Sequence, residues 1–320
     1  MGPNAVGKTN ILEAAYLLAT GKSFRAEKEI EAIKEGETVG RVVGTTVGDE
    51  LEVDFDARLR FSKTYKVNGV GKRQADFVGN LFAVLFSPLD LEIIVNGPAV
   101  RRRYLDSVLS QVHKDYRIAS QVYEKALRQR NRLLYQIREL GIWNQESRKR
   151  LEYWNELLIT NGKIIHERRK EYLEFLNNLP TRILPISLKY DHSIISSERL
   201  EKYAREELAA AATLVGPHRD DFTIGDRGRN QESRELKSFG SRGEQRLAVF
   251  AIKLGELEYV REATGQNPVL FLDDIFSELD HTNRHHILEV IPKQQTIMTT
   301  TDLHLVEKEY VKHVELIELQ

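Results

Sequence analysis

The octet at residues 2–9 constrains this chain more than any other feature of its sequence. It reads G-P-N-A-V-G-K-T and matches the pattern G-x-x-x-x-G-K-[S/T] without a gap. The glycines let the loop curl so that successive backbone N–H groups face one centre, and Lys8 and Thr9 add an ammonium and a hydroxyl. A run with helical spacing follows as far as Gly21, so the positive end of a helix points at the same centre. These are the parts of a phosphate-binding loop.

The octet therefore predicts a site for ATP with Mg²⁺. Lys8 is expected to reach the β- and γ-phosphate oxygens, and the Thr9 hydroxyl to hold the metal. Only Met1 precedes the loop, and we expect that the strand which normally leads into such a loop is missing from this chain. The predicted nucleotide-binding residues are Gly2, Pro3, Asn4, Ala5, Val6, Gly7, Lys8 and Thr9.

A second candidate element of the site, a strand that ends in acids, lies about 260 residues after the phosphate loop. Residues 267–274 read N-P-V-L-F-L-D-D, a continuous apolar run that is typical of a buried parallel strand, followed by two acids. Ligands bind α/β sheets at the carboxyl ends of the strands. We expect Asp273 to hold Mg²⁺, usually through water, and Asp274 to orient or activate the attacking water. Alone, the pattern also fits a solvated strand end.

A second helix start lies between these two elements. Residues 239–246 read F-G-S-R-G-E-Q-R and open an amphipathic helix, so Ser241 and Gly243 form another potential anion site, although a simple N-cap explains Ser241 equally well. The order of phosphate loop, serine-glycine helix start, acidic strand and S-E-L-D resembles that of ABC-type ATPases. The resemblance implies that Ser241, Arg242 and Gly243 face the γ-phosphate held by another subunit. It also implies a D-loop formed by Ser277, Glu278, Leu279 and Asp280.

Further blocks of this kind recur along nearly the whole chain: F-S-P at 86–88, G-P at 97–98 with R-R-R-Y-L-D at 101–106, Q-R-N-R-L-L at 129–134, and L-V-G-P-H-R-D-D at 214–221. Within the ABC class, these blocks resemble the RecF family of bacterial DNA repair and replication proteins. The expected absence of the strand before the loop is the largest departure from the family pattern. In three further departures, Leu89 replaces an acid, Asn96 replaces a glycine, and residues 299–302 follow the strand at 296–298 without the histidine common in ABC ATPases. The last departure favours slow hydrolysis.

The DNA substrates and protein partners expected for this chain follow from the resemblance and not from the chemistry of its residues. The resemblance implies an ATP-dependent homodimer that binds single-stranded DNA, gapped duplexes and single-to-double-strand junctions during the response to DNA damage. It further implies RecO and RecR as partners, which help to load RecA. A weak ATPase activity would then serve to release the DNA.

The fold class that we predict is α/β, an ABC-type P-loop ATPase head with an antiparallel β subdomain and an inserted helical lobe. Alternating polar and apolar residues at 39–67, with a turn at Asn68-Gly69, indicate the antiparallel sheet. We expect Gly141, Gly162, Pro180 and Pro185 to divide the lobe into short helices. The predicted boundaries are 1–98 for the first part of the head, 99–212 for the lobe, and 213–320 for the rest of the head.

Charge is concentrated in the predicted lobe. The whole chain has a formal net charge of −1, but residues 101–170 contain 17 Lys and Arg against 8 Asp and Glu, an excess of nine. A solvated helix face is one interpretation, and internal ion pairs are another. The size of the excess beside an ABC head favours a surface for DNA phosphates. The candidate DNA-binding residues are Arg128, Arg130, Arg132, Arg148, Lys149 and Arg150.

Composition narrows the remaining possibilities. The sequence has no cysteine and no apolar run of about 18 residues, so we expect a soluble cytoplasmic protein without disulfides, thiolate metal sites or a membrane span. A transport ATPase is therefore disfavoured. A nuclease would need a cluster of carboxylates and histidines, for which residues 218–221 and 280–281 are the only candidates. A degenerate head that acts as a scaffold without turnover is the other alternative, although Lys8, Thr9, Asp273 and Asp274 are all intact.

Overall fold

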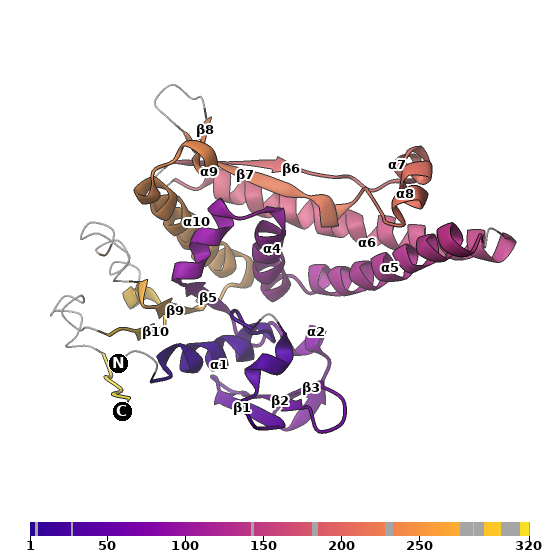
Figure 1. Cartoon of the computed structure of the whole chain (residues 1–320). Helices are drawn as coiled ribbons and strands as arrows, with labels where there is room; N and C mark the ends of the chain where they lie inside the picture. The colour runs from indigo at the N-terminus through magenta and orange to yellow at the C-terminus, as the bar shows by residue number, and fades with distance from the viewer. Residues whose placement is uncertain are drawn as a thin grey trace. The chain divides into compact units, whose positions relative to one another are not determined.

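The computed structural model of the chain is shown in Figure 1. It describes residues 1–3, 6–26, 28–141, 144–180, 185–227, 233–275, 284, 291–301 and 314–319. The chain divides into a first unit of residues 1–91 with 249–320, and a second unit of residues 92–248. The first unit therefore draws on both ends of the chain.

The first unit combines a parallel and an antiparallel sheet with helices. Its elements are α1 (Lys8–Thr20), η1 (Glu29–Ala32), β1 (Val39–Thr45), β2 (Glu50–Asp56), β3 (Ser62–Val67), β4 (Val70–Lys72), α2 (Gln74–Phe77), β5 (Ala83–Phe86), η2 (Pro88–Leu91), most of α10 (Arg242–Thr264), β9 (Val269–Asp273), η5 (Ile291–Lys293) and β10 (Thr296–Thr299).

The three parallel strands lie in the order β10-β9-β5. The central strand β9 is the apolar run that precedes the two acids, and its residues Leu270, Phe271 and Leu272 are almost completely buried. A strand with neighbours on both sides and both faces covered can be apolar throughout. The prediction of a buried parallel strand that ends at Asp273 is confirmed.

The four antiparallel strands follow each other in sequence order, β1-β2-β3-β4. The turn between β3 and β4 has Asn68 at φ 53° and Gly69 at φ 74°, the two left-handed residues that a tight hairpin prefers. The antiparallel sheet expected at residues 39–67 is therefore confirmed.

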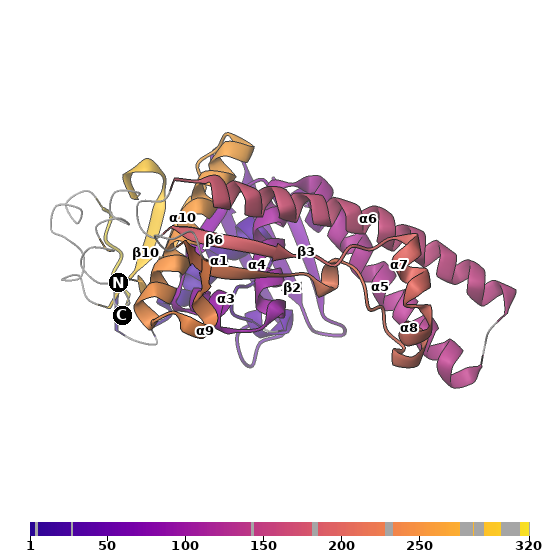
Figure 2. The same cartoon turned by 90° about the horizontal axis from the view of Figure 1, so that it is seen from above.

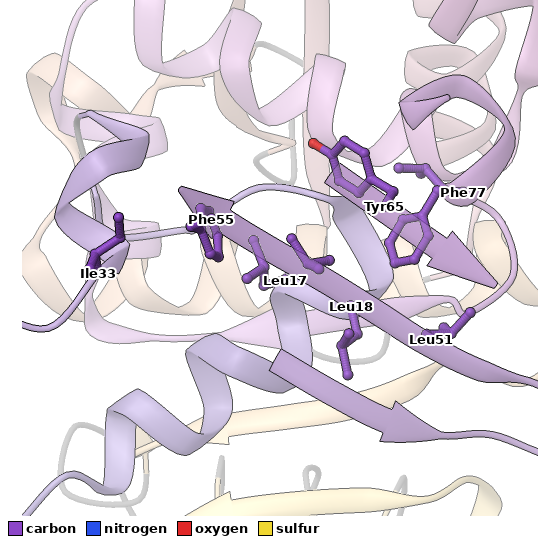
Figure 3. Close-up of a cluster of buried hydrophobic side chains, with 9 residues drawn as sticks. Leu17, Leu18, Ile33, Leu51, Phe55, Tyr65 and Phe77 are labelled. Atoms are coloured by element: carbon purple, nitrogen blue, oxygen red, sulfur yellow. The ribbon is translucent and has the colours of Figure 1, made fainter. Parts of the chain in front are cut away.

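One hydrophobic cluster fixes helix α1 to the antiparallel sheet (Figure 3). Leu17 and Leu18 of α1 pack with Leu51, Val53 and Phe55 of β2, all of them buried. Burying a side chain of this size contributes about 1.5–3 kcal/mol to stability. Since α1 starts at the phosphate loop, this packing also holds the loop's helical end in place.

The second unit is mainly helical. Its elements are α3 (Glu92–Val95), α4 (Pro98–Val112), α5 (Lys114–Leu140), α6 (Gln145–Asn178), β6 (Ile186–Asp191), α7 (Ser197–Lys202), α8 (Ala204–Ala210), η3 (Pro217–Arg219), β7 (Asp221–Arg227), β8 (Ser233–Glu235), α9 (Leu236–Phe239) and the beginning of α10.

Helices α5 and α6 form a long hairpin, as both views in Figures 1 and 2 show. The expectation of short helices is wrong for α6, which runs through Gly162 over 34 residues. A Cβ atom at Gly162 would lie 2.6 Å from Ile195 Cγ2, so this glycine allows close packing instead of ending the helix. Among the described residues, no helix combines the length and the apolar character needed to span a bilayer.

The second unit also contains a sheet that the sequence patterns do not indicate. Strands β6, β7 and β8 are antiparallel and lie in that order. Strand β7 pairs with β6 over residues 186–191, and the second unit spans residues 92–248. The unit thus extends well beyond the lobe boundaries of 99–212 expected from the sequence.

Candidate functional site

The phosphate-loop motif lies at the start of α1, in the first unit. Gly7 precedes the helix with φ 100°, a left-handed conformation that favours glycine. The Lys8 ammonium is buried in the loop, where it donates hydrogen bonds to the carbonyl oxygens of Gly2 at 2.7 Å and Pro3 at 2.8 Å. Asn4 and Ala5 lie outside the described residues. Lys8 is therefore held inside the loop in which we expect phosphates to bind.

The structure brings Thr9 and Asp273 into direct contact although 264 positions separate them. The Thr9 hydroxyl donates a hydrogen bond to Asp273 Oδ1 at 2.9 Å. Asp273 is the last residue of β9 and is 9% exposed. The contact follows from the fold, because the start of α1 and the carboxyl end of β9 lie at the same edge of the parallel sheet. The two residues expected to hold Mg²⁺ are thus neighbours.

These oxygen groups suit Mg²⁺. Magnesium prefers oxygen ligands and is usually held by one or two carboxylates together with substrate phosphates and water, not by a cage of protein groups. A hydroxyl and a carboxylate within hydrogen-bond distance offer such a partial set. In the described part of the chain, no group of three or more His, Cys, Asp or Glu could hold a metal by itself.

Asp274 follows directly after the strand and has an unusual backbone. Its φ is 49°, one of three positive values among non-glycine residues of the described chain. Its backbone N–H donates a hydrogen bond to Thr299 Oγ1 at 3.2 Å. The turn thereby directs the chain away from β9 immediately after the first acid.

Thr299 is a site residue that the sequence patterns did not single out. It ends β10, and its hydroxyl donates to Asp273 Oδ1 at 2.8 Å. The signal for it in the sequence is the missing histidine, since residues 299–301 are all threonine. A hydroxyl occupies the end of this strand and contacts the first acid.

The serine-glycine helix start lies in the second unit and is exposed to solvent. Ser241 Oγ accepts a hydrogen bond from the Glu244 N–H at 3.2 Å, while Glu244 Oε2 accepts one from the Ser241 N–H at 2.7 Å. This is a reciprocal capping box. The Ser241 contacts, together with Arg234, lower the pKa of Glu244. The predicted D-loop, residues 277–280, lies outside the described residues.

Gly243 has no evident packing role among the described residues of its own chain. A Cβ atom there would meet only Ser241 Oγ, at 4.0 Å. Ser241, Arg242 and Gly243 are all exposed. The described residues leave space for a side chain, so their contacts do not explain why glycine stands at this position.

The basic lobe is partly an internal ion-pair network. Arg130, predicted as a DNA contact, is 4% exposed, and this prediction is wrong. Its guanidinium donates to Glu207 Oε2 at 2.6 Å, Asn155 Oδ1 at 2.7 Å and Thr213 Oγ1 at 2.8 Å. An arginine committed to three internal acceptors cannot reach a DNA phosphate. The other candidates, Arg128, Arg132, Arg148, Lys149 and Arg150, are exposed.

A second network joins two of the sequence blocks that resemble RecF. Arg101 Nε donates to Asp221 Oδ1 at 2.6 Å, and Arg102 Nη1 donates to the Asp220 carbonyl at 2.8 Å. The buried guanidinium of Arg169 donates hydrogen bonds to Asp220 Oδ2 at 2.9 Å and to Asp106 Oδ1 at 2.8 Å. The blocks at 101–106 and 214–221 therefore bind each other inside the second unit.

The same network accounts for the nuclease candidates at residues 218–221. Burial lowers the pKa of His218 to about 4, and its ring contacts Tyr123 Oη at 2.8 Å and the Thr213 carbonyl at 3.0 Å. Asp220, which is 1% exposed, accepts hydrogen bonds from Arg169 and the Ser193 N–H. The side chains of His218 and Asp220 are therefore engaged in internal hydrogen bonds. They form no metal-binding group among the described residues.

Comparisons with known proteins agree with this arrangement. A family model described as "AAA domain, putative AbiEii toxin, Type IV TA system" matches residues 1–307. The DNA replication and repair protein RecF of Herpetosiphon aurantiacus is 37% identical to this chain, covering 94% of it and 86% of the relative. RecF of Thermosynechococcus vestitus is also 37% identical, covering 95% and 84%. The chain belongs to the RecF family.

A solved structure supports the same assignment. The structure named "recombination mediator protein RecF-ATP in RecFOR pathway" has a TM-score of 0.82 and 35% identity, and the match covers 94% of this chain and 85% of that one. The predicted fold class, an ABC-type P-loop ATPase head with an antiparallel β subdomain and an inserted helical lobe, is confirmed. This chain is thus a RecF-family DNA replication and repair protein.

Proposed function

We propose that this RecF-family protein is an ATP-dependent mediator of recombinational DNA repair. ATP with Mg²⁺ binds at Lys8, Thr9 and Asp273, and Ser241 and Gly243 of a second copy close over the γ-phosphate. The resulting homodimer binds gapped duplexes and single-to-double-strand junctions. Slow hydrolysis, assisted by Asp274, opens the dimer and releases the DNA.

The observation that carries this proposal is the 2.9 Å contact between Thr9 and Asp273. The phosphate loop provides groups for the phosphates, the acidic strand provides a carboxylate for the metal, and this contact joins the two parts of the site. Magnesium supplies charge neutralisation at the β- and γ-phosphates when it is bound. In this chain, Thr9 and Asp273 provide the oxygens, and Lys8 lies buried in the loop next to them.

The second copy is inferred from the exposed helix start. Ser241 and Gly243 are open to solvent, and the N-terminus of α10 favours an anion. The backbone there leaves room for a close approach at Gly243. A nucleotide held by another subunit fits both features and makes its contacts only in the closed state.

DNA binding is supported by the charge on the helical hairpin. Arg148, Lys149 and Arg150 are exposed at the beginning of α6, and Arg128 and Arg132 are exposed on α5. Contacts from such groups go mainly to phosphates and tolerate any base sequence. Membership of the RecF family supports RecO and RecR as partners, the loading of RecA, and action in the cytoplasm.

Sedimentation velocity with and without ATP-Mg²⁺ tests the dimer. We expect the wild-type protein and the exposed control variant Lys22→Ala to dimerise with ATP. Lys8→Ala should lose both nucleotide binding and dimerisation, because Lys8 contacts the phosphates. Ser241→Arg should keep nucleotide binding and lose the dimer, since the larger side chain blocks the shared face.

Two outcomes contradict the proposal. Dimers that form with ATP in Lys8→Ala would show that the phosphate loop does not control assembly. Dimers that form in Ser241→Arg would show that this helix start is not part of the interface. A catalytically degenerate scaffold is the alternative, and it predicts ATP-dependent dimers with no phosphate release by either wild type or Asp274→Asn.

A further inference from the structure

Thr299 lies opposite the first acid of the site because of the strand register. Strand β10 pairs in parallel with β9, and Thr299 is the partner of Asp273 in that pairing. Thr299 is 6% exposed. Its side chain is therefore buried at the same sheet edge as the proposed nucleotide site.

The Thr299 hydroxyl contacts both acids at once. It donates a hydrogen bond to Asp273 Oδ1 at 2.8 Å and accepts one from the Asp274 N–H at 3.2 Å. A hydroxyl has one proton to donate and two lone pairs that accept, so both bonds can form together. The other acceptor in reach, the Leu272 carbonyl, is 3.5 Å away and is a much weaker competitor.

For Asp273, the consequence is a fixed carboxylate. Oδ1 receives two hydroxyl donors, from Thr9 at 2.9 Å and from Thr299 at 2.8 Å. These bonds restrict rotation of the carboxylate and keep its second oxygen, Oδ2, in a defined direction. Groups that orient a metal-binding carboxylate typically change metal affinity 10–100-fold when they are removed.

For Asp274, the consequence is a fixed backbone. A positive φ is uncommon for a residue with a side chain, and such a conformation persists only where neighbouring contacts hold it. The hydrogen bond to Thr299 is one such contact. It sets the direction in which the Asp274 side chain leaves the end of β9.

We infer that Thr299 is a positioning residue that aligns the metal-binding acid and the water-activating acid as one unit. This inference rests on the proposed function, in which Asp273 and Asp274 take those roles. In many ABC ATPases a histidine follows this strand, whereas here Thr299 ends it. The Thr299 hydroxyl acts through the two acids and not on the phosphate. Thr299 is accordingly not a catalytic residue.

The test compares hydroxyl-free and hydroxyl-bearing side chains at the same position. Thr299→Val keeps the shape of the side chain and removes the hydroxyl, whereas Thr299→Ser keeps the hydroxyl. Thr296→Val serves as a matched control, because Thr296 begins the same strand and its hydroxyl contacts two backbone carbonyls at 3.4 Å in the described part of the chain. Binding of a fluorescent ATP analogue is titrated with Mg²⁺ and repeated in excess chelator.

We expect Thr299→Val to need about 10-fold more Mg²⁺ for half-maximal nucleotide binding. Its binding in chelator should match that of the wild type, since the phosphate loop is unchanged. Thr299→Ser and Thr296→Val should show the wild-type Mg²⁺ requirement. A purely structural role of Thr299 would lower binding equally with and without the metal.

The inference is overturned if Thr299→Val has the wild-type Mg²⁺ requirement, or if Thr299→Ser is as impaired as Thr299→Val. If Thr299→Val does not fold, Thr299→Ala removes the same hydroxyl and is judged by the same outcomes. A failure of the proposed function looks different. In that case, the wild-type protein itself would bind the analogue without any dependence on Mg²⁺, or not at all.

Discussion

Replacing Arg130 with methionine should destabilise the second unit strongly and leave DNA contacts unchanged. Methionine approximates the volume of the arginine stem but carries no charge and no donors. The change removes the partner of Glu207, whose side chain is completely buried. It also leaves Asn155 and Thr213 without the donors that they accept from in the native protein.

The expected cost is about 3–5 kcal/mol, the usual penalty when one member of a buried ion pair is deleted. Among the described contacts of its carboxylate, Glu207 keeps the hydrogen bond from the Leu214 N–H, at 2.8 Å. A typical domain is stable by about 5–15 kcal/mol, so this is a large share. Replacing Glu207 with glutamine in the same variant removes the stranded charge. The double variant should therefore recover at least half of the loss.

Urea unfolding followed by tryptophan fluorescence provides the assay. Both tryptophans of the sequence, Trp143 and Trp154, fall within residues 92–248, so the signal reports on the second unit. A loss below about 1 kcal/mol for Arg130→Met is the range of an exposed pair and would refute the reasoning. So would a double variant that is less stable than the single one. At temperatures where the variant is folded, the salt dependence of its DNA binding should equal that of the wild type.

Two further predictions concern the same unit. Changing Arg148, Lys149 and Arg150 together to serine should weaken the salt dependence of DNA binding. The slope of log K against log salt should become shallower by up to about 3 for duplex DNA, at about 0.9 per phosphate contact. A slope equal to that of the exposed control Lys163→Ser would exclude this cluster from the DNA-binding surface. Burial lowers the pKa of His218 from 6.5 to about 4, so the unfolded state binds the proton more tightly. The free energy of unfolding should therefore fall by about 3 kcal/mol as the pH drops from 6.5 to 4. In His218→Asn, the free energy of unfolding measured with urea should depend less on pH over that range, and an equally steep loss would show that other groups cause it.

The parts of the fold that depend on local pattern were predictable from the sequence. The loop before Lys8 requires its glycines locally, the apolar run before Asp273 indicates a central strand, and Asn68-Gly69 specifies a hairpin turn. In each case, a few neighbouring residues determine the backbone. The proximity of Thr9 and Asp273 was predictable as well, because the topology of parallel sheets brings such ends together.

The sequence-based predictions were wrong or incomplete where residues far apart in the sequence determine the local structure. Arg130 has the same local sequence context as exposed Arg128 and Arg132, and its burial depends on Glu207, 77 positions away. Gly162 reads as a helix breaker, whereas its role is set by Ile195 on another segment. Thr299 becomes a site residue only through the register of two strands. Single-sequence patterns contain none of this pairing information.

The position of Asp220 has a consequence for how related sequences can vary. Its carboxylate and carbonyl accept from four donors that lie far apart along the chain: Arg102, Arg169, Tyr190 and the Ser193 amide. A single substitution here would leave the three donors of the carboxylate, Arg169, Tyr190 and the Ser193 amide, without this acceptor, whereas the backbone carbonyl that binds Arg102 would remain. Substitutions at Asp220 should therefore be rare among related sequences and should occur together with changes in its partners. A homologue that lacks the aspartate is expected to differ at Arg169 and Tyr190 too.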